Sequence, residues 1–254
     1  MRLIEFRKNI YSQNGEDGVI EEILQRLAHL YQPGVVVEFG AWDGMHLSNT
    51  YNLVENFNFS AVYIEGDPDK FIDLQKTALI QSRITPVCAM LSSTGMGDTK
   101  TLDSILSELG ISEVTLLSID IDSIDLEIWA SSVVDAKIVV IEINSSIEPG
   151  IIRWNNPPRN TGNSFSATLQ VAVRKGYSLV CHTGNMIFVR SDLVGDLKLD
   201  SLDLEYPERL FLTNWLGLRP SLKEVLLRSL TRVPAKYKRQ IRNVMGMKSV
   251  NYDT

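Results

Sequence analysis

One stretch of ten residues, 35–44, constrains the fold of this chain most strongly. It reads Val-Val-Val-Glu-Phe-Gly-Ala-Trp-Asp-Gly, and its branched apolar run predicts a buried strand. Gly40 and Gly44 predict a sharp turn after the strand, where a ligand can approach the backbone without meeting a Cβ atom. The acid Glu38 repels phosphate and favours a ligand that offers hydroxyl or ammonium groups. An ordinary strand followed by a glycine turn is the alternative interpretation.

Further apolar runs predict that this strand belongs to a seven-stranded sheet. Four of them lie at residues 60–64, 84–90, 114–122 and 136–144. Segments with the apolar spacing of helices lie between or before them, at 19–30, 51–57, 69–80, 102–109, 124–131 and 164–175. This alternation is typical of an α/β fold with a mostly parallel sheet, in which Pro86 indicates an edge strand. Residues 177–182 and 186–190 flank a turn with Gly184 and predict a final antiparallel hairpin.

Charge divides the chain into two parts. Residues 219–254 hold nine of the 25 Lys and Arg residues but only two of the 31 Asp and Glu residues. We therefore expect one domain over 1–218, with a net charge of −13, and a basic helical extension over 219–254. The acidic domain argues against a nucleic-acid partner. The extension is expected to contact a membrane surface or a protein partner, or to neutralise the acidic domain.

The cellular setting follows from what the sequence does not contain. No run reaches the 18 apolar residues of a membrane span, and the N-terminus lacks the apolar core of a signal peptide. Cys88 and Cys181 lie far apart without a metal-like spacing. We therefore expect a cytoplasmic protein with reduced cysteines.

A second acid, Glu65, ends the apolar run at 60–64, 25 residues after Gly40. An acid at this place binds the ribose in doubly wound folds, and a carboxylate accepts hydrogen bonds from both hydroxyls of a diol. A solvated acid at a strand end is the alternative. Gln13 and Asn14 precede the first helical segment, where helix capping is the alternative to a ligand contact.

Four oxygen-bearing side chains follow the fourth and fifth predicted strands. Asp120 and Asp122 are two residues apart, as are Glu142 and Asn144, so each pair projects in a similar direction. If the two strands are neighbours, these groups meet at the carboxyl edge of the sheet, where α/β folds bind ligands. Three interpretations stay open: a Mg²⁺ site, a site for an ammonium group with a catalytic base, or caps of neighbouring helices.

The segment 145–163 contains several prolines and glycines and no clear periodicity. A loop of this length in a compact domain is often functional. We expect Arg153, Trp154 and Arg159 to contact the substrate as part of a lid, with an ordinary surface loop as the alternative.

The turn after the first strand resembles motif I of the class I S-adenosylmethionine (SAM) methyltransferases. An ordered set of motifs narrows this resemblance to the FkbM-type methyltransferases over about residues 10–192. The motifs lie at 12–18, 38–44, 48–50, 118–122, 141–144 and 175–177. The resemblance implies a Rossmann-like sandwich and O-methylation of sugars or polyketide-type natural products. Relatives often read Asp-x-Glu-Gly where this chain has Asp120-Ile121-Asp122-Ser123, which leaves the role of the second acid open.

The resemblance also implies roles for individual residues. For SAM binding we expect Gln13, Asp17, Glu38, Gly40, Ala41, Gly44, Asn49, Glu65 and Asp120. The base that removes the acceptor proton is expected among Asp120, Asp122 and His46, with His182 less favoured. Some sugar O-methyltransferases use a metal at this edge, and here its ligands would be Asp120, Glu142 and Asn144.

The sequence therefore favours a SAM-dependent O-methyltransferase that acts on a sugar, glycan or natural-product hydroxyl. A non-catalytic protein of the same fold, acting as a partner or scaffold in a glycan-assembly complex, is the alternative. An NAD-dependent oxidoreductase is disfavoured because the chain lacks the G-x-G-x-x-G pattern at this turn.

Overall fold

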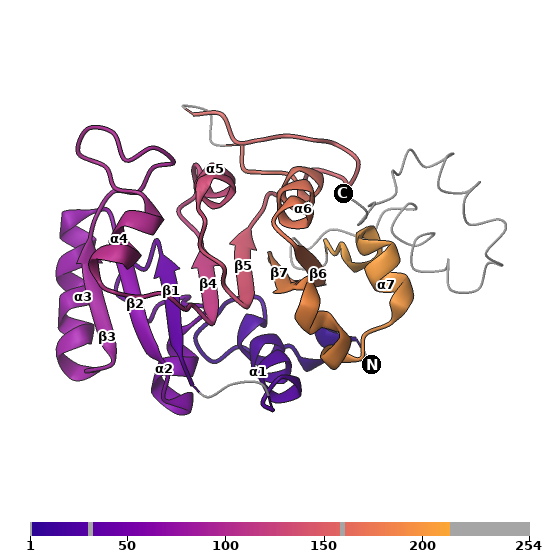
Figure 1. The fold of residues 1–254 in the computed structure, drawn as a ribbon, viewed down its shortest axis with the longest axis horizontal. Coiled ribbons are helices and arrows are strands. Elements are labelled where there is room, and N and C mark those ends of the chain that lie inside the picture. Colours follow the sequence, from indigo (N-terminus) through magenta and orange to yellow (C-terminus); the bar gives the residue numbers. More distant parts are fainter. Residues whose placement is uncertain (1, 30–32, 158–160, 214–254) are drawn as a thin grey trace, which may run out of the picture.

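A seven-stranded sheet forms the centre of the molecule (Figure 1). The computed structural model describes residues 2–29, 33–157 and 161–213. The strand order is β3-β2-β1-β4-β5-β7-β6, and only the pairings of β7 with β5 and with β6 are antiparallel. The predicted α/β class, with a mostly parallel sheet that ends in an antiparallel hairpin, is confirmed.

The elements have the following bounds. The strands are β1 (Val35–Phe39), β2 (Ser60–Glu65), β3 (Ile84–Cys88), β4 (Leu116–Ile119), β5 (Ile138–Glu142), β6 (Tyr177–His182) and β7 (Asn185–Arg190). The α-helices are α1 (Glu16–Arg26), α2 (Tyr51–Phe57), α3 (Pro68–Ile80), α4 (Leu102–Glu108), α5 (Asp125–Ser131), α6 (Phe165–Arg174) and α7 (Ser201–Glu205). Short 3-10 helices are η1 (Leu3–Phe6), η2 (Ser191–Leu197) and η3 (Pro207–Leu210).

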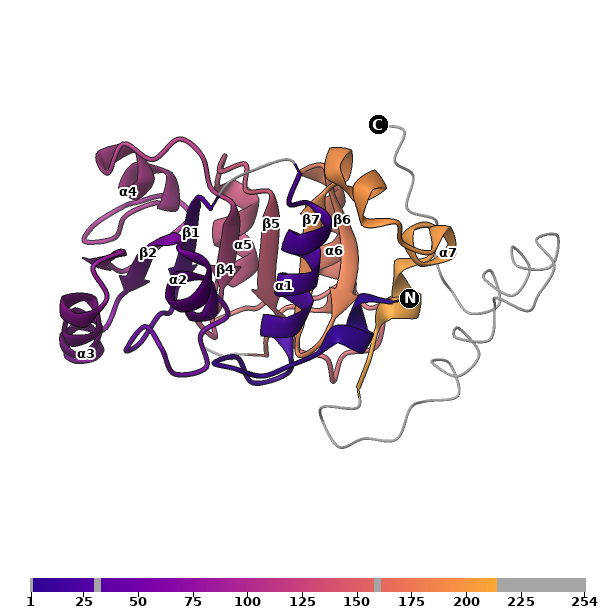
Figure 2. The ribbon, with the colours of Figure 1, turned by 90° about the horizontal axis from the view of Figure 1, so that it is seen from below.

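Helices cover both faces of the sheet (Figures 1 and 2). Successive strand residues point to opposite faces, so Val36 joins the buried cluster with α1, α2 and α3. Val37 and Phe39 join the cluster on the other face, with α4, α5 and α6. The continuous apolar strands are thus explained by burial on two sides.

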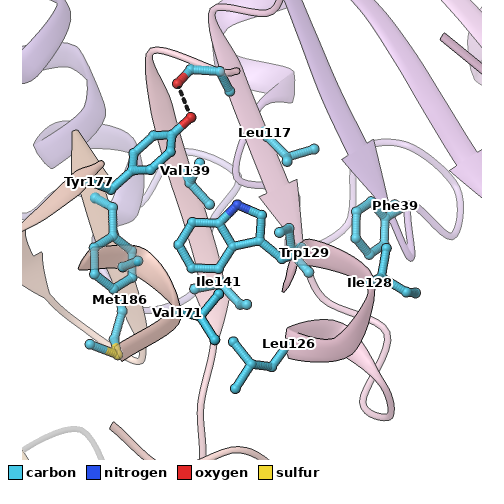
Figure 3. Close-up of a cluster of buried hydrophobic side chains, with 14 of the residues drawn as sticks. Phe39, Leu117, Leu126, Ile128, Trp129, Val139, Ile141, Val171, Tyr177 and Met186 are labelled. Atoms are coloured by element: carbon cyan, nitrogen blue, oxygen red, sulfur yellow. Dashed lines mark hydrogen bonds between the residues drawn. The ribbon is translucent and has the colours of Figure 1, made fainter. Parts of the chain in front are cut away.

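Trp129 of α5 anchors the second of these clusters (Figure 3). Its indole is fully buried and lies edge-on to the Tyr177 ring, with 5.8 Å between the ring centroids. The Tyr177 hydroxyl donates to the backbone carbonyl of Ala136 at 2.5 Å. This packing ties α5 to β4, β5 and β6, and so supports the strands whose ends carry the acidic side chains.

The carboxyl ends of the parallel strands meet at one edge of the sheet. Strand β1 lies between β2 and β4, and β4 pairs with β5. The acidic residues were expected to meet only if the fourth and fifth strands were neighbours, and they are. Strand β3, which contains Pro86, lies at the other end of the sheet from the hairpin. The edge position predicted for this strand is confirmed.

Strands β4 and β5 end earlier than their apolar runs, at Ile119 and Glu142. The chain turns after β4 because both oxygens of the Asp125 carboxylate accept backbone N–H groups, from Ile121 at 2.7 Å and from Ser123 at 2.9 Å. Asp122 in this turn has a φ of 55°. Asp120 and Asp122 therefore belong to a turn, and their side chains are not related by the alternation of a strand.

Among the described residues, no helix is long and apolar enough to cross a membrane. The basic extension expected at 219–254 lies outside the described residues, as does Arg159.

Candidate active site

A cavity of about 500 Å³ opens at the carboxyl edge of the sheet. Its walls come from the ends of β1, β2, β4 and β5, from the segment after β3 and from the first turns of α3. Residues expected from the sequence to lie in a site contribute much of the wall: Gln13, Glu38, Gly40, Ala41, His46, Glu65, Asp120, Asp122 and Glu142. The edge is where open α/β sheets bind ligands.

Glu38 is buried, and donors surround its carboxylate. The hydroxyls of Ser48 and Thr50 donate to Oε2 at 2.7 and 2.5 Å, and the backbone N–H of Asn49 donates to Oε1 at 3.2 Å. Burial raises the pKa of Glu38, and the hydrogen bonds from Thr50 and Ser48 lower it in part. The carboxylate is therefore a fixed acceptor at the cavity wall.

Glu65 is held in a similar way at the end of β2. Its Oε2 accepts the backbone N–H of Trp42 and its Oε1 that of Asp67, both at 2.8 Å. Each oxygen has a second lone pair, so the carboxylate can still accept hydrogen bonds from two hydroxyl groups. These bonds orient Glu65 in the cavity wall without using its full capacity.

The acids after β4 and β5 have different surroundings. Asp120, Asp122 and Glu142 each place an oxygen within 4.8 Å of the others. Among the described residues, no amide or hydroxyl group donates a hydrogen bond to them. Burial, followed by the neighbouring carboxylates, raises the pKa of Asp120 to about 7 and that of Glu142 to about 9. The cluster therefore favours protons, a cation or hydrogen-bond donors from a ligand.

The same three residues could hold a divalent cation. Three carboxylates at this spacing, free of other donors, offer the hard oxygen ligands that Mg²⁺ prefers. The fourth predicted group, Asn144, lines a second, smaller cavity with Asp122 and Glu142. Its side-chain amide donates to the Thr161 carbonyl at 2.7 Å, and its Oδ1 accepts from the backbone N–H and the hydroxyl of Ser146. These contacts hold Asn144 to its own loop, and its role as a metal ligand stays a prediction.

The two motif glycines are needed mainly for protein packing. A Cβ atom on Gly40, at φ +79°, would lie 1.7 Å from the backbone oxygen of Asp120. One on Gly44, at φ +80°, would press on Leu74 and Tyr63, and Gly44 is absent from the cavity wall. Protein atoms fill the space beside both glycines, but Gly40 also lines the cavity, so the approach of a ligand to its backbone stays a prediction.

Two other residues expected to bind SAM support the site from outside the cavity wall. Asp17 is buried, and its Oδ2 accepts the backbone N–H groups of residues 10, 11 and 12 and the Ser12 hydroxyl, all at 2.8 Å. The Asn49 side chain donates to the Ser118 hydroxyl at 3.1 Å. Neither lines the cavity, since their polar groups serve the local backbone and a neighbouring strand.

The two histidines have different positions. His46 lies on the exposed wall of the cavity, with its ring edge-on to Trp42 at a centroid distance of 5.3 Å. His182 is buried away from the cavity, and burial lowers its pKa to about 3. The backbone N–H of Leu212 donates to its Nδ1 at 2.9 Å, so its Nε2 carries the proton and donates to Ser145. His182 is structural, and the weaker expectation for it as a base is wrong.

The described part of the predicted lid does not reach the cavity. Arg153 and Trp154 are exposed, and neither lines the cavity wall. The backbone of Arg153 accepts a hydrogen bond from the backbone N–H of Ser164. Asn155 donates its side-chain amide to the Ser123 carbonyl, which attaches this loop to the turn after β4. The loop therefore borders the acid cluster through Asn155.

Sequence reasoning missed several residues of the cavity wall, notably Trp42, Leu47, Lys70 and Met90. The Lys70 ammonium lies 5.3 Å from the centre of the Trp42 ring. Trp42 and Leu47, like Asp122, have a positive φ, and such strained residues gather at functional sites. An aromatic residue inside a glycine turn was the available signal for Trp42.

Comparisons with protein-family models and with curated protein sequences find no match. Solved structures of methyltransferases show a likeness of fold. TrmK of M. capricolum, bound to S-adenosyl-homocysteine, matches with a TM-score of 0.45 and 12% identity over 87% of this chain and 96% of that chain. The CMeT domain of the citrinin polyketide synthase matches with a TM-score of 0.46 and 10% identity over 72% of this chain and 55% of that chain. Fibrillarin of Aeropyrum pernix, bound to SAM, matches with a TM-score of 0.43 and 12% identity over 67% of this chain and 73% of that chain. At these values the likeness concerns the fold alone.

Proposed function

We propose that this chain is a cytoplasmic SAM-dependent methyltransferase of the FkbM type, which methylates a hydroxyl group of a sugar, glycan or natural product. One observation carries the proposal. Glu38 and Glu65, at the ends of the adjacent strands β1 and β2, are both buried and line one cavity with Asp120. Two fixed carboxylates suit a ligand with an ammonium group and a diol, and SAM has both.

In this proposal each carboxylate binds one part of the cofactor. Glu65 accepts hydrogen bonds from the two ribose hydroxyls, using the lone pairs that Trp42 and Asp67 leave open. Glu38 pairs with the ammonium group of the methionine part, because it is a fixed acceptor at the cavity wall. Gln13 and Ala41 complete the wall beside it.

The acid cluster then performs the chemistry. When bound, SAM would supply a methyl group that passes from its sulfonium to the acceptor oxygen and leaves a neutral thioether, and a carboxylate of the cluster would take the acceptor proton. Asp120 is our candidate base, because its pKa of about 7 suits proton transfer near neutral pH. Asp122 and His46 are more exposed and border the mouth of the cavity. The enzyme's main contribution is to align oxygen, methyl carbon and sulfur.

A divalent cation would be held by Asp120, Asp122 and Glu142, and when bound it would polarise the acceptor hydroxyl. Clustered carboxylates disfavour a phosphorylated acceptor and accept hydrogen bonds from hydroxyl groups. An acceptor screen should therefore compare sugars, polyketide-type alcohols and RNA, each with and without Mg²⁺.

Calorimetry with S-adenosylhomocysteine (SAH) tests the proposal. We expect SAH to bind the native protein and NAD not to bind. Glu65→Ala should weaken SAH by about 1.5–3 kcal/mol, because two hydrogen bonds to a charged group are lost. The matched control is Glu108→Ala, which removes an acid that pairs with Lys100 on the surface of α4. Absence of heat with SAH and the native protein would reject the proposal.

A further inference from the structure

Three polar side chains form a row across neighbouring strands beneath the cavity. Glu38 of β1 is in register with Tyr63 of β2 on one side and with Ser118 of β4 on the other. All three are buried. The segment Ser48-Asn49-Thr50, which leads into α2, contacts this row with every one of its residues.

The contacts converge on one carboxylate. Thr50 has one hydroxyl proton and donates it to Glu38, and the Thr50 and Tyr63 hydroxyl oxygens lie 2.9 Å apart. Tyr63 therefore supplies the proton of that second bond. The Ser48 hydroxyl donates to Glu38 and also accepts the backbone N–H groups of Thr50, at 3.2 Å, and Tyr51, at 2.9 Å. The Glu38 carboxylate cannot rotate without breaking this set of bonds.

None of the supporting residues lines the cavity, whereas Glu38 does. A purely structural role would require only that the buried carboxylate oxygens of Glu38 accept hydrogen bonds from the protein. Here Oε2 takes two hydroxyl protons, and Oε1 takes the more distant backbone N–H of Asn49. An unequal arrangement of this kind leaves acceptor capacity on Oε1.

We propose that Ser48, Thr50 and Tyr63 are positioning residues, which hold Glu38 in the orientation that binds the ammonium group of the cofactor. This inference rests on the proposed function. Burial raises the pKa of Glu38, and the hydrogen bonds from Thr50 and Ser48 offset part of that rise because they stabilise the charged form. The other titratable groups near Glu38 are Tyr63 itself and Asp120 of the neighbouring strand end.

The test replaces the central hydroxyl. Thr50→Val keeps the shape of the side chain but removes the donor, and Thr50→Ser restores it. Thr168→Val is the matched control, because Thr168 is fully buried and its hydroxyl donates to the backbone carbonyl of Ser164, the N-cap residue of α6. The affinity for SAH is measured by calorimetry across pH 5.5–8.5, with thermal unfolding recorded for each variant.

We expect Thr50→Val to bind SAH about tenfold or more weakly at pH 7, as for the loss of a hydrogen bond to a charged group. As the pH is lowered, the affinity of this variant for SAH should also begin to fall at a higher pH than that of the native protein, because Glu38 becomes protonated at a higher pH. Thr50→Ser should stay within about threefold of native affinity, and Thr168→Val should not change it. Tyr63→Phe serves as a second variant if Thr50→Val does not fold, and it should shift affinity in the same direction.

Native affinity and an unchanged pH profile in folded Thr50→Val would overturn the inference, as would a Thr50→Ser variant as weak as Thr50→Val. Failure of the native protein to bind SAH would instead reject the proposed function. In that case NMR of ¹³C-labelled glutamate in the ligand-free protein still decides the positioning role. We expect the Glu38 carboxyl signal, identified by Glu38→Gln, to titrate at a higher pH in Thr50→Val, and an equal pKa would overturn the inference.

Discussion

The two ends of the cavity hold carboxylates in different surroundings, which are buried at Glu38 and Glu65 and half-buried at Asp120 and Glu142. At the ends of β1 and β2, donors from the protein surround Glu38 and Glu65. At the ends of β4 and β5, Asp120 and Glu142 face other carboxylates, and no described amide or hydroxyl group donates to them. The first pair is held by these donors, whereas burial and neighbouring carboxylates raise the pKa of Asp120 to about 7 and that of Glu142 to about 9.

In the proposed enzyme, this difference would separate binding from chemistry along one sheet edge. A carboxylate that is held by protein donors is a fixed acceptor for the hydrogen-bond donors of a ligand. A carboxylate in a buried acidic cluster has a raised pKa and can accept a proton from an acceptor hydroxyl. The same residue type thus serves two functions, and the surroundings decide which.

The largest expected effect is on the stability of the fold, at the contact between Gly40 after β1 and Asp120 after β4. Gly40→Ala should destabilise the protein by about 3 kcal/mol or more, because the new Cβ atom would meet the Asp120 backbone oxygen at 1.7 Å. Gly110 has a similar φ, +68°, with nothing within 4 Å of its hypothetical Cβ. Gly110→Ala should therefore cost only about 1 kcal/mol, the strain of its backbone. Urea unfolding measures the free energy of unfolding of both variants. Equal losses would show that the contact between residue 40 and the Asp120 backbone does not contribute.

Asp120→Asn should affect turnover and spare binding. We expect the rate of methyl transfer to fall about 100-fold or more, as for the loss of a general base. Affinity for SAH, which has no positive sulfur, should change by less than about threefold, because Glu38 and Glu65 remain. Single-turnover kinetics and calorimetry check the two halves of this prediction. A variant with near-native turnover would move the role of base to Asp122 or His46.

The smallest expected effect is on the pH dependence of stability. Burial and neighbouring acids raise the folded-state pKa of Glu142 to about 9, so the folded protein holds more protons than the unfolded chain between about pH 4.5 and pH 9. The free energy of unfolding should therefore fall as the pH rises through this range. Glu142→Gln should flatten the fall by about 1–2 kcal/mol, allowing for partial solvent screening. Urea unfolding at pH 6 and pH 8.5 gives the comparison, and parallel curves would contradict it.

The sequence was sufficient for the elements that local pattern determines. Buried runs such as 138–141 are apolar without interruption, and the acids follow one another along the chain in the order of the strands that present them. Glu38, Glu65 and Asp120 could be placed at one edge because parallel strands end together.

Other features depend on contacts between distant segments. Asn144 donates to the Thr161 carbonyl, and Asn49 donates to the Ser118 hydroxyl, and neither partner is visible in a local motif. The need for Gly40 comes from a neighbouring strand. Lys70 reaches the cavity only because α3 follows β2 at the correct angle, which spacing does not encode. The sequence therefore identified the acids better than their partners.

The central claim is that fixed acids bind the cofactor and clustered acids perform the chemistry. Titration of SAH into the native protein, Glu38→Gln and Asp120→Asn by calorimetry tests it most directly. We expect the native protein and Asp120→Asn to bind SAH alike, while Glu38→Gln binds at least about tenfold more weakly, since a charged partner of the ammonium group is lost. Binding that depends on Asp120 but not on Glu38, or no binding to any of the three, would contradict it.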